Sequence, residues 1–425
     1  MLKKMIGFVA FAMATISFGA YVELAKDGGA RDQGLDNAIA YSGPLNALPI
    51  IWGAATLAAV GFVWIVLRFR IKPHWTLLCL WSLSMFSSFW AEVPKASLGA
   101  ALLLTAAYLL VVTHIRLLRW NGVLHAAIKC VLIFEVSSFI YIFLIPHYGL
   151  GVGEHLGKWQ GIFTHKNTLG SFGALAFLIS FWYYLTYKSK LGLLSTILSF
   201  ALVIGSQSTT SYAIVSIVFV LNILCLFRFP RNVLYANRMC ILIGLLLLSA
   251  GAVYMAITSN VDVSDEKYSS FSNRNLIWLY MFVRVATSPL WGFGLDQLSI
   301  VNSLDGSDFI SGVGFLVASA HNGFIETLFS LGLFGLVTLV AVLVSFVRNM
   351  PANKAFPLLL GYIFLFILEN TFESKLLSFN SCFIVLLYMI EGTKSLNAET
   401  TQALNAETTH HLARREHAVD EWGAV

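Results

Sequence analysis

The sequence is dominated by a series of apolar runs, each about as long as a membrane is thick. A helix needs roughly 20 apolar residues to cross the hydrocarbon core. Hydrophobic residues make up 58% of the chain and charged residues only 12%, whereas charged residues are about a quarter of a soluble domain. We therefore predict an all-α integral membrane protein of about twelve transmembrane helices. The runs lie near residues 5–25, 45–67, 74–91, 96–113, 123–145, 167–187, 191–206, 211–227, 239–258, 323–347, 355–370 and 376–391.

Basic residues alternate between the predicted loops and so predict the orientation. Lys and Arg near helix ends stay on the cytoplasmic side of a membrane. With the N-terminus inside, the inner loops hold most of the basic residues, such as Lys188, Arg228 and Arg348, and no acidic residue lies in an inner loop between spans. We expect a multi-pass protein of the bacterial inner membrane with both termini cytoplasmic. The net charge of +5 follows from this topology, so we expect no nucleic-acid partner.

The chain is expected to form one membrane domain over residues 1–394, followed by a mobile cytoplasmic tail over 395–425. Two outer loops, at about 146–166 and 259–322, are longer than a tight connection requires, and loops of that length are often functional. The stretch 275–286 in the second outer loop, between the ninth and tenth spans, predicts a short amphipathic helix on the membrane surface. The five cysteines fall in different spans with no close pair, so we predict neither a disulfide nor a metal site.

Three polar clusters stand at the outer ends of the spans. The first is the segment Gly161-Ile-Phe-Thr-His165-Lys166-Asn167-Thr-Leu-Gly170. Its structural interpretation is that Asn167 caps the sixth span while His165 and Lys166 lie at the membrane interface. Its functional interpretation makes these three residues ligands of a substrate, and the sequence alone leaves both open.

The second cluster is Ser270-Phe-Ser-Asn-Arg274-Asn275, at the start of the predicted surface helix. An arginine presents a fixed fork of donors suited to phosphate, and a helix N-terminus adds free N–H groups. Arg284 lies ten residues further on, about 80° round the helix and roughly 15 Å along it. One phosphate cannot contact both, so we favour Arg274 as the ligand and a structural role for Arg284, which stays a weaker candidate for substrate binding.

The third cluster is Ser319-Ala-His321-Asn322-Gly323, directly before the tenth span. A histidine with an ordinary pKa near 6.5 suits proton transfer at neutral pH, although a lone interfacial histidine is more often structural. Gly332 and Gly335 follow, and small residues let membrane helices pack closely. The ionisable side chains Glu135 and Glu326 lie within predicted spans, where each must be protonated, paired or wet. Glu369 and Glu373 flank the last outer turn and are candidates to orient His321.

At these residues the chain resembles the O-antigen ligase and Wzy-type polysaccharide polymerase family, and in particular its exopolysaccharide-polymerase branch. His321-Asn322 with Gly332 and Gly335 resembles the family's His-Asn motif, and Ser270-x-x-x-Arg274 resembles its loop arginine motif. The segment from Gly161 to Gly170 is similar to the branch's Gly-x-Phe-x-His-Lys-Asn-x-x-Gly signature. Together the motifs cover residues 161–335.

The resemblance implies a metal-independent, inverting glycosyltransferase without a cofactor, acting on undecaprenyl-diphosphate-linked oligosaccharide at the outer face of the inner membrane. His321 and Arg274 would be catalytic, as general base and diphosphate ligand, and His165, Lys166, Asn167, Asn322, Lys158 and Arg284 would bind substrate. The chain departs from the family at Gln160, where members often carry arginine, and between Ser206 and Ser211, where many carry a basic residue. Lys158 or Lys166 then supplies the second phosphate contact.

The polymerase interpretation has two rivals. A ligase moves finished chains to lipid A core or protein, and these motifs do not separate the acceptors. A transporter or flippase for the lipid-linked sugar predicts charged groups throughout the bundle and inverted repeats, whereas the polar clusters here gather at one face and the two halves share no repeat. The expected partners are the lipid-linked oligosaccharide, an acceptor glycan or lipid, membrane lipids and other polysaccharide assembly proteins.

Overall fold

The computed structural model describes residues 61, 74–163, 165–258, 274–298, 319–377, 382–398 and 401. Within these ranges the regular elements are helices, with one isolated antiparallel bridge between Leu150 and Trp159. The all-α prediction is therefore confirmed for this part of the chain. The helices of the bundle are α5 (Trp75–Phe86), α6 (Pro94–Leu144), α8 (Lys166–Tyr187), α9 (Lys190–Ser206), α10 (Thr209–Leu224), α12 (Arg238–Thr258), α16 (Gly323–Arg348), α17 (Phe356–Phe372) and a helix over 382–398.

Four of the described helices, α6, α8, α12 and α16, are long and apolar enough to cross a membrane. The count becomes five if α10 and the short α11 (Arg228–Ala236), which bends away by 117°, form one span. α5, α9 and α17 are shorter apolar helices. The predicted spans near 5–25 and 45–67 lie outside the described residues, so the figure of about twelve spans stays a prediction. The expected tail boundary at 394/395 falls inside the helix over 382–398, and the remainder of the tail is outside the described residues except for 401.

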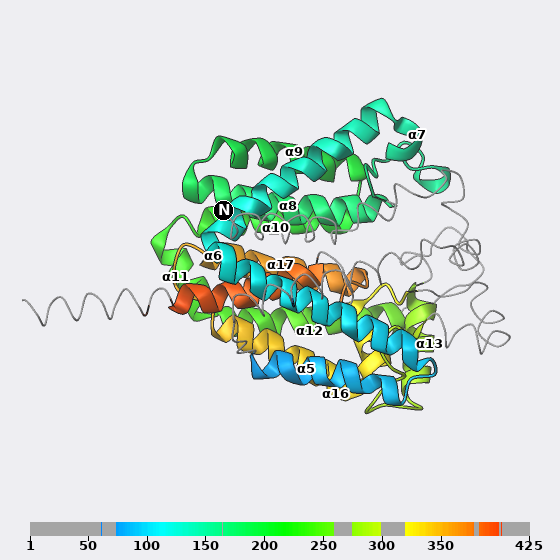
Figure 1. Ribbon diagram of the computed structural model, residues 1–425. Helices are drawn as coiled ribbons and strands as arrows, with labels where there is room; N and C mark the ends of the chain where they lie inside the picture. The colour runs from blue at the N-terminus through cyan, green and yellow to red at the C-terminus, as the bar shows by residue number, and fades with distance from the viewer. Residues whose placement is uncertain are drawn as a thin grey trace, which may run out of the picture.

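The two spans predicted near 96–113 and 123–145 together form α6, an element of 51 residues. At 1.5 Å per residue a straight helix of this length would measure roughly 75 Å, more than twice the hydrocarbon thickness. The element is broken at Arg119, whose φ of 56° is non-helical. Figure 1 shows its two halves diverging from that break toward the same end of the bundle. The expected inner loop between these spans is thus mostly helical and turns at one residue.

α17 lies at the centre of the bundle, with most of its residues buried, and it packs against α8, α10, α12 and α16. α12 lies further out, because Leu247 and Leu248 are 67% and 62% exposed. Large apolar side chains on an outer surface are costly in water but favourable against lipid. The bundle therefore has the polarity of a membrane protein.

α16 is interrupted at Gly332, and the backbone of residues 289–293 replaces part of the hydrogen bonding of the helix there. Gly332 has a φ of +63° inside the helix. Leu333 N–H donates to Pro289 O at 2.8 Å, and Phe293 N–H donates to Phe329 O at 2.9 Å. A Cβ on Gly332 would lie 2.2 Å from Leu290 O. Gly332 is thus required by a backbone crossing, which is a more specific reason than the helix packing expected from the sequence.

The helix predicted over 275–286 is α13 (Arg274–Val285). Its apolar face is Ile277, Trp278 and Met281, all nearly inaccessible, and these side chains pack with residues of α12 and α16. α13 therefore lies against the bundle with one apolar face, while Leu279 and Val283 are 50% and 62% exposed on the other. α13 and the short α7 (Pro146–Gly149) mark one end of the bundle and α11 the opposite end (Figure 1).

Candidate active site

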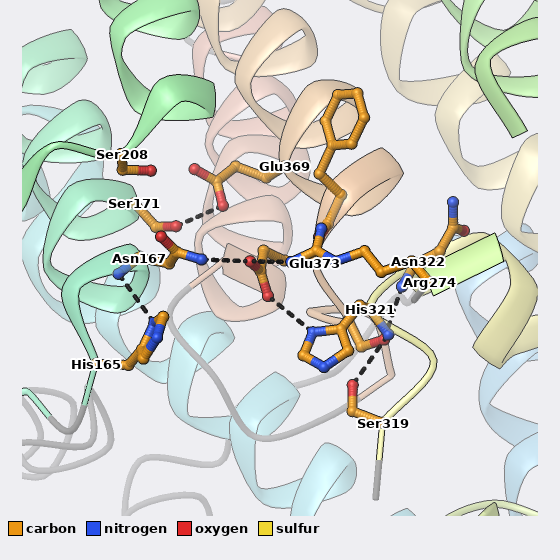
Figure 2. Close-up of polar contacts among 12 residues, drawn as sticks. His165, Asn167, Ser171, Ser208, Arg274, Ser319, His321, Asn322, Glu369 and Glu373 are labelled. Carbon is orange, nitrogen blue, oxygen red and sulfur yellow. Dashed lines mark hydrogen bonds and ion pairs between the residues drawn. The ribbon is translucent and has the colours of Figure 1, made fainter. Parts of the chain in front are cut away.

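The carboxylate of Glu373 is the centre of a polar site at the end of α17. Glu373 is the residue at which α17 stops, and its N–H still donates to Glu369 O at 2.8 Å. Its side chain is 19% exposed. Three segments bring polar groups to it: the start of α8, the start of α13 and the residues before α16 (Figure 2).

His321 approaches Glu373 from the segment before α16. Its Nδ1 lies 3.5 Å from Glu373 Oε2, at the long end of the hydrogen-bond range, and its side chain is 43% exposed. The residue has a φ of 48°, a left-handed conformation that few residues other than glycine adopt, and such strain gathers at functional sites. Asn322 then caps α16, since its Oδ1 accepts from Ile325 N–H at 2.9 Å.

Arg274 approaches from the first residue of α13. Its Nη2 lies 3.3 Å from Glu373 Oε1, and its Nη1 donates to the carbonyl oxygen of Phe372. The guanidinium is 18% exposed, and a helix N-terminus adds a favourable field for an anion. Arg274 and His321, 47 residues apart in number, thus meet on opposite oxygens of one carboxylate.

The start of α8 supplies a third group. Asn167 Nδ2 donates to Glu373 Oε1 at 3.1 Å. Asn167 N–H itself donates to His165 Nδ1 at 3.1 Å, so His165 caps the helix. The cap that the sequence analysis gave to Asn167 therefore belongs to His165, because the side chain of Asn167 turns to the carboxylate instead (Figure 2).

A second set of contacts lies one helical turn deeper. Ser171 Oγ donates to Glu369 Oε2 at 2.6 Å, and Lys375 Nζ lies 3.3 Å from the same oxygen. Asn167 and Ser171 are four residues apart on α8, and Glu369 and Glu373 are four apart at the end of α17. Residues four apart share a helix face, so α8 and α17 are joined by two parallel polar contacts.

The charges around Glu373 keep it ionised. Burial alone would raise the pKa of Glu373, but the hydrogen bond with His321 and the charges of Arg274 and Lys375 lower it to about 2. For Lys375, burial lowers the pKa, and the neighbouring Glu369 and Glu373 raise it above its ordinary value. The carboxylate of Glu373 is therefore a negative charge surrounded by cations, and the surrounding hydrogen-bond donors are directed toward it.

The two lysines proposed for the second phosphate contact lie at the rim. Lys166 Nζ donates to Gln207 O at 3.4 Å, in the turn between α9 and α10. The charges of both Lys158 and Glu373 act on Lys166, so these groups share one neighbourhood. Lys166 is thus close to the carboxylate site without being bonded to it.

The remaining predicted ligands are engaged within the protein. Asn322 is fully buried, and its Nδ2 donates to Thr371 O at 2.9 Å. The guanidinium of Arg284 lies 5.6 Å from the centre of the Phe293 ring. Gln160, at the position where relatives were expected to carry arginine, is buried and donates to Tyr148 O at 3.1 Å.

Sequence reasoning missed Ser171 and Lys375. It named Glu373 as a candidate to orient His321, and the structure brings these two side chains together. It did not give Arg274 or Asn167 as partners of Glu373. One signal was available: two glutamates spaced four apart at the end of an apolar run. Charged groups at such a depth are costly and need partners. The sequence does not say which of the polar groups at the outer ends of the spans are the partners of these glutamates.

The fold and the site together define a helical multi-pass membrane protein with a polar, partly open site at one end of its bundle. Residues 193–340 match the model of the O-antigen ligase family. This match confirms the family resemblance drawn from the motifs, and it includes Arg274 and His321. No curated protein matches the chain. The family is one of membrane enzymes that handle lipid-linked glycans, and the matched range ends before Glu369 and Glu373.

Proposed function

We propose that the chain is an inverting glycosyltransferase that polymerises undecaprenyl-diphosphate-linked oligosaccharide at the outer face of the bacterial inner membrane. The observation that supports it most is the meeting of Arg274 and His321 on the two oxygens of Glu373. The Arg274 guanidinium, which can bind a diphosphate, and the His321 imidazole, which can accept a proton, can then contact the same substrate. The imidazole of His321 is 43% exposed, so a substrate can reach it.

In this proposal His321 is the general base. Its Nδ1 donates to Glu373, which leaves Nε2 to accept the proton of the acceptor hydroxyl. The acceptor oxygen attacks the anomeric carbon of the donor sugar and forms the new C–O bond. The bond from that carbon to the diphosphate breaks, and its electron pair leaves with the diphosphate. Attack from the opposite face inverts the centre, while Glu373 stabilises the imidazolium that forms.

Arg274 neutralises the leaving diphosphate. A fork of N–H donors stabilises charge as it develops on phosphate oxygens, a task that cations perform at many phosphate sites. Glu373 and the Phe372 carbonyl contact this fork in the structure. A bound diphosphate would take over part of it, and Lys166 at the rim would add a second positive charge. Lys158 is the alternative for that second contact.

An apolar groove beside the site supports a lipid-linked donor. It has a volume of about 500 Å³ and lies between α12, α13 and α16. Its lining includes Asn322, the residue after His321, together with Val253, Tyr254, Phe282 and Leu328. A groove of this kind accepts a hydrocarbon chain while the attached headgroup stays at the polar end of the bundle.

The matched family is described as O-antigen ligase, and this favours a ligase as the second candidate. A ligase would use the same proton transfer but deliver the glycan to lipid A core or to protein. We prefer the polymerase because the first motif has the His165-Lys166-Asn167 form that resembles the polymerase branch. This motif lies outside the matched range.

Reconstitution in proteoliposomes with a lipid-linked repeat unit tests the proposal. The wild type should lengthen the glycan in steps of one repeat, visible as a ladder on a gel, and His321→Ala should abolish it while the protein stays monodisperse in detergent. A single transfer to added lipid A core with no ladder would establish the ligase instead. Wild-type turnover by His321→Ala would remove the histidine from the mechanism.

A further inference from the structure

The short helix α11 (Arg228–Ala236) lies at the end of the bundle opposite the candidate site (Figure 1). It follows α10 after a bend of 117°, so it runs across the bundle end and not along the membrane normal. None of its residues is buried. The sequence places this end on the cytoplasmic side, because Lys188, Lys190 and Arg348 lie in the same set of loops.

One face of α11 is attached to the bundle. The Tyr235 ring packs edge-on against Phe356 with 5.3 Å between the ring centres. Arg238, just past the helix, donates to Val347 O at 3.1 Å and stacks over Tyr235 at 4.2 Å. These contacts fix the orientation of α11 about its own axis.

The opposite face presents apolar side chains to the surroundings. Phe229 and Val233, four residues apart and therefore on one side of the helix, are 78% and 45% exposed. Phe227, just before the helix, is 62% exposed. Aromatic and aliphatic side chains on a short helix that crosses the end of membrane spans suit the boundary between headgroups and acyl chains.

Arg228 and Arg231 are the charged groups of this helix. Within the part of the chain that the structure describes, no carboxylate or carbonyl is bonded to either guanidinium, in contrast to Arg238. No acidic residue occurs between 188 and 238. Two arginine forks next to exposed aromatic side chains fit the phosphate of a lipid whose acyl chains contact Phe229 and Val233.

We propose that α11 is an interfacial helix that binds anionic phospholipid headgroups of the cytoplasmic leaflet through Arg228 and Arg231. This site is separate from the proposed glycosyltransferase site, and it does not depend on that function. Net positive charge alone would orient the protein in the membrane. Orientation in the membrane does not require an exposed apolar face beside the arginines, whereas binding of a lipid does.

Native mass spectrometry of the full chain in detergent with equal amounts of phosphatidylglycerol and phosphatidylcholine tests the proposal. The wild type should retain phosphatidylglycerol preferentially, and Arg228→Gln/Arg231→Gln should reduce that preference by about five-fold for each arginine. Lys188→Gln/Lys190→Gln removes the same charge from a neighbouring loop and should keep the wild-type preference. Phe229→Ala/Val233→Ala should reduce retention of both lipids.

Two outcomes would overturn the proposal: an unchanged lipid preference in the arginine variant, or an equal loss in the lysine variant, which would indicate a general charge effect. Arg228→Lys/Arg231→Lys keeps the charge and provides a second test if the glutamine variant does not fold. This variant should keep part of the phosphatidylglycerol preference, because lysine binds phosphate as a point charge, but less than the wild type, because lysine lacks the guanidinium fork. A preference equal to that of the wild type would contradict the contact between the forks and the lipid phosphate.

Discussion

The side-chain amide of Asn167 and the carboxylate of Glu373, 206 residues apart in the chain, form a hydrogen bond of 3.1 Å. This contact ties the first sequence motif to the site at which Arg274 and His321 meet. It predicts that Asn167→Ala lowers the transfer rate by about tenfold, since a hydrogen bond to a charged group contributes roughly 1.5–3 kcal/mol. Asn167→Asp should cost more, because it places a second carboxylate against Glu373.

Initial rates in proteoliposomes measure both changes. Asn121→Ala is a matched control, since Asn121 accepts from Tyr187 OH at 3.2 Å in an exposed position on α6, and it should leave the rate unchanged. If Asn167→Asp works as well as the wild type, the amide is not holding Glu373 in the active protein.

Glu373→Gln keeps the size of the side chain and removes its charge. It should lower kcat on the order of 10²- to 10³-fold, because the imidazolium formed at His321 loses its counter-ion and its orientation.

Arg274→Gln should lower kcat and also raise KM for the lipid-linked donor, since the arginine contacts the diphosphate in the proposed mechanism. The Glu373→Gln/Arg274→Gln double variant should lose less transition-state stabilisation than the sum of the losses in the two single variants, because the two residues share one ion pair. Fully additive losses would show that the two side chains act independently.

The low pKa of Glu373 predicts a dependence of stability on acid. The pKa is about 2 in the folded protein and 4.5 in its reference state, so the folded state binds fewer protons. The ionised carboxylate then stabilises the fold fully above pH 4.5, by on the order of 3 kcal/mol, and this contribution is lost as the pH falls from 4.5 to 2. Thermal unfolding in detergent should show the wild type losing stability across this window. The Glu373→Gln variant should be less stable than the wild type at pH 6, and its stability should change less as the pH falls. Parallel curves of stability against pH for the two proteins would contradict the prediction.

Much of the bundle could be predicted from composition and spacing. The runs predicted near 167–187, 239–258 and 323–347 agree closely with α8, α12 and α16, because long apolar stretches bounded by charges have one stable form in lipid. Arg119 shows the limit. The chain reverses there without proline and with its nearest glycine three residues away, so no local signal distinguishes a turn from a continuous helix.

The same limit applies to the site. His321, Arg274 and Asn167 were identifiable from local motifs, and Glu373 was a candidate to orient His321, but the contacts of Glu373 with Arg274 and Asn167 were not predictable. Glu373 contacts residues 52, 99 and 206 positions away, and pairing at that range is decided by packing of α8, α13 and α16 around α17. Asn322 shows the opposite case: a motif residue expected to bind substrate whose side chain is used to cap α16 and to hold Thr371.

The break in α16 predicts a specific cost for a small substitution. Gly332→Ala would require a positive φ and would bring Cβ within 2.2 Å of Leu290 O, so it should destabilise the protein by at least about 1–3 kcal/mol. Gly244→Ala on α12 is the control, since a Cβ there meets no atom within 4 Å. Thermal unfolding of the two variants in the same detergent compares them. Equal melting temperatures would mean that the segment 289–294 moves aside without cost.

The groove beside Asn322 predicts that donors with long and short lipids respond differently to a blocked wall. Val253 lines the groove on α12, so Val253→Trp should narrow it and raise KM for a donor with a long polyprenyl chain, by about tenfold if several apolar contacts are lost. A donor with a short, water-soluble lipid does not need the groove, and its KM should change little. Leu248→Trp adds the same bulk at a position of α12 that is 62% exposed and outside the groove lining, and it should act like the wild type with both donors. A rise in KM of equal size for the two donors would place the effect of Val253→Trp on the polar site, and the lipid would then have to bind elsewhere on the bundle.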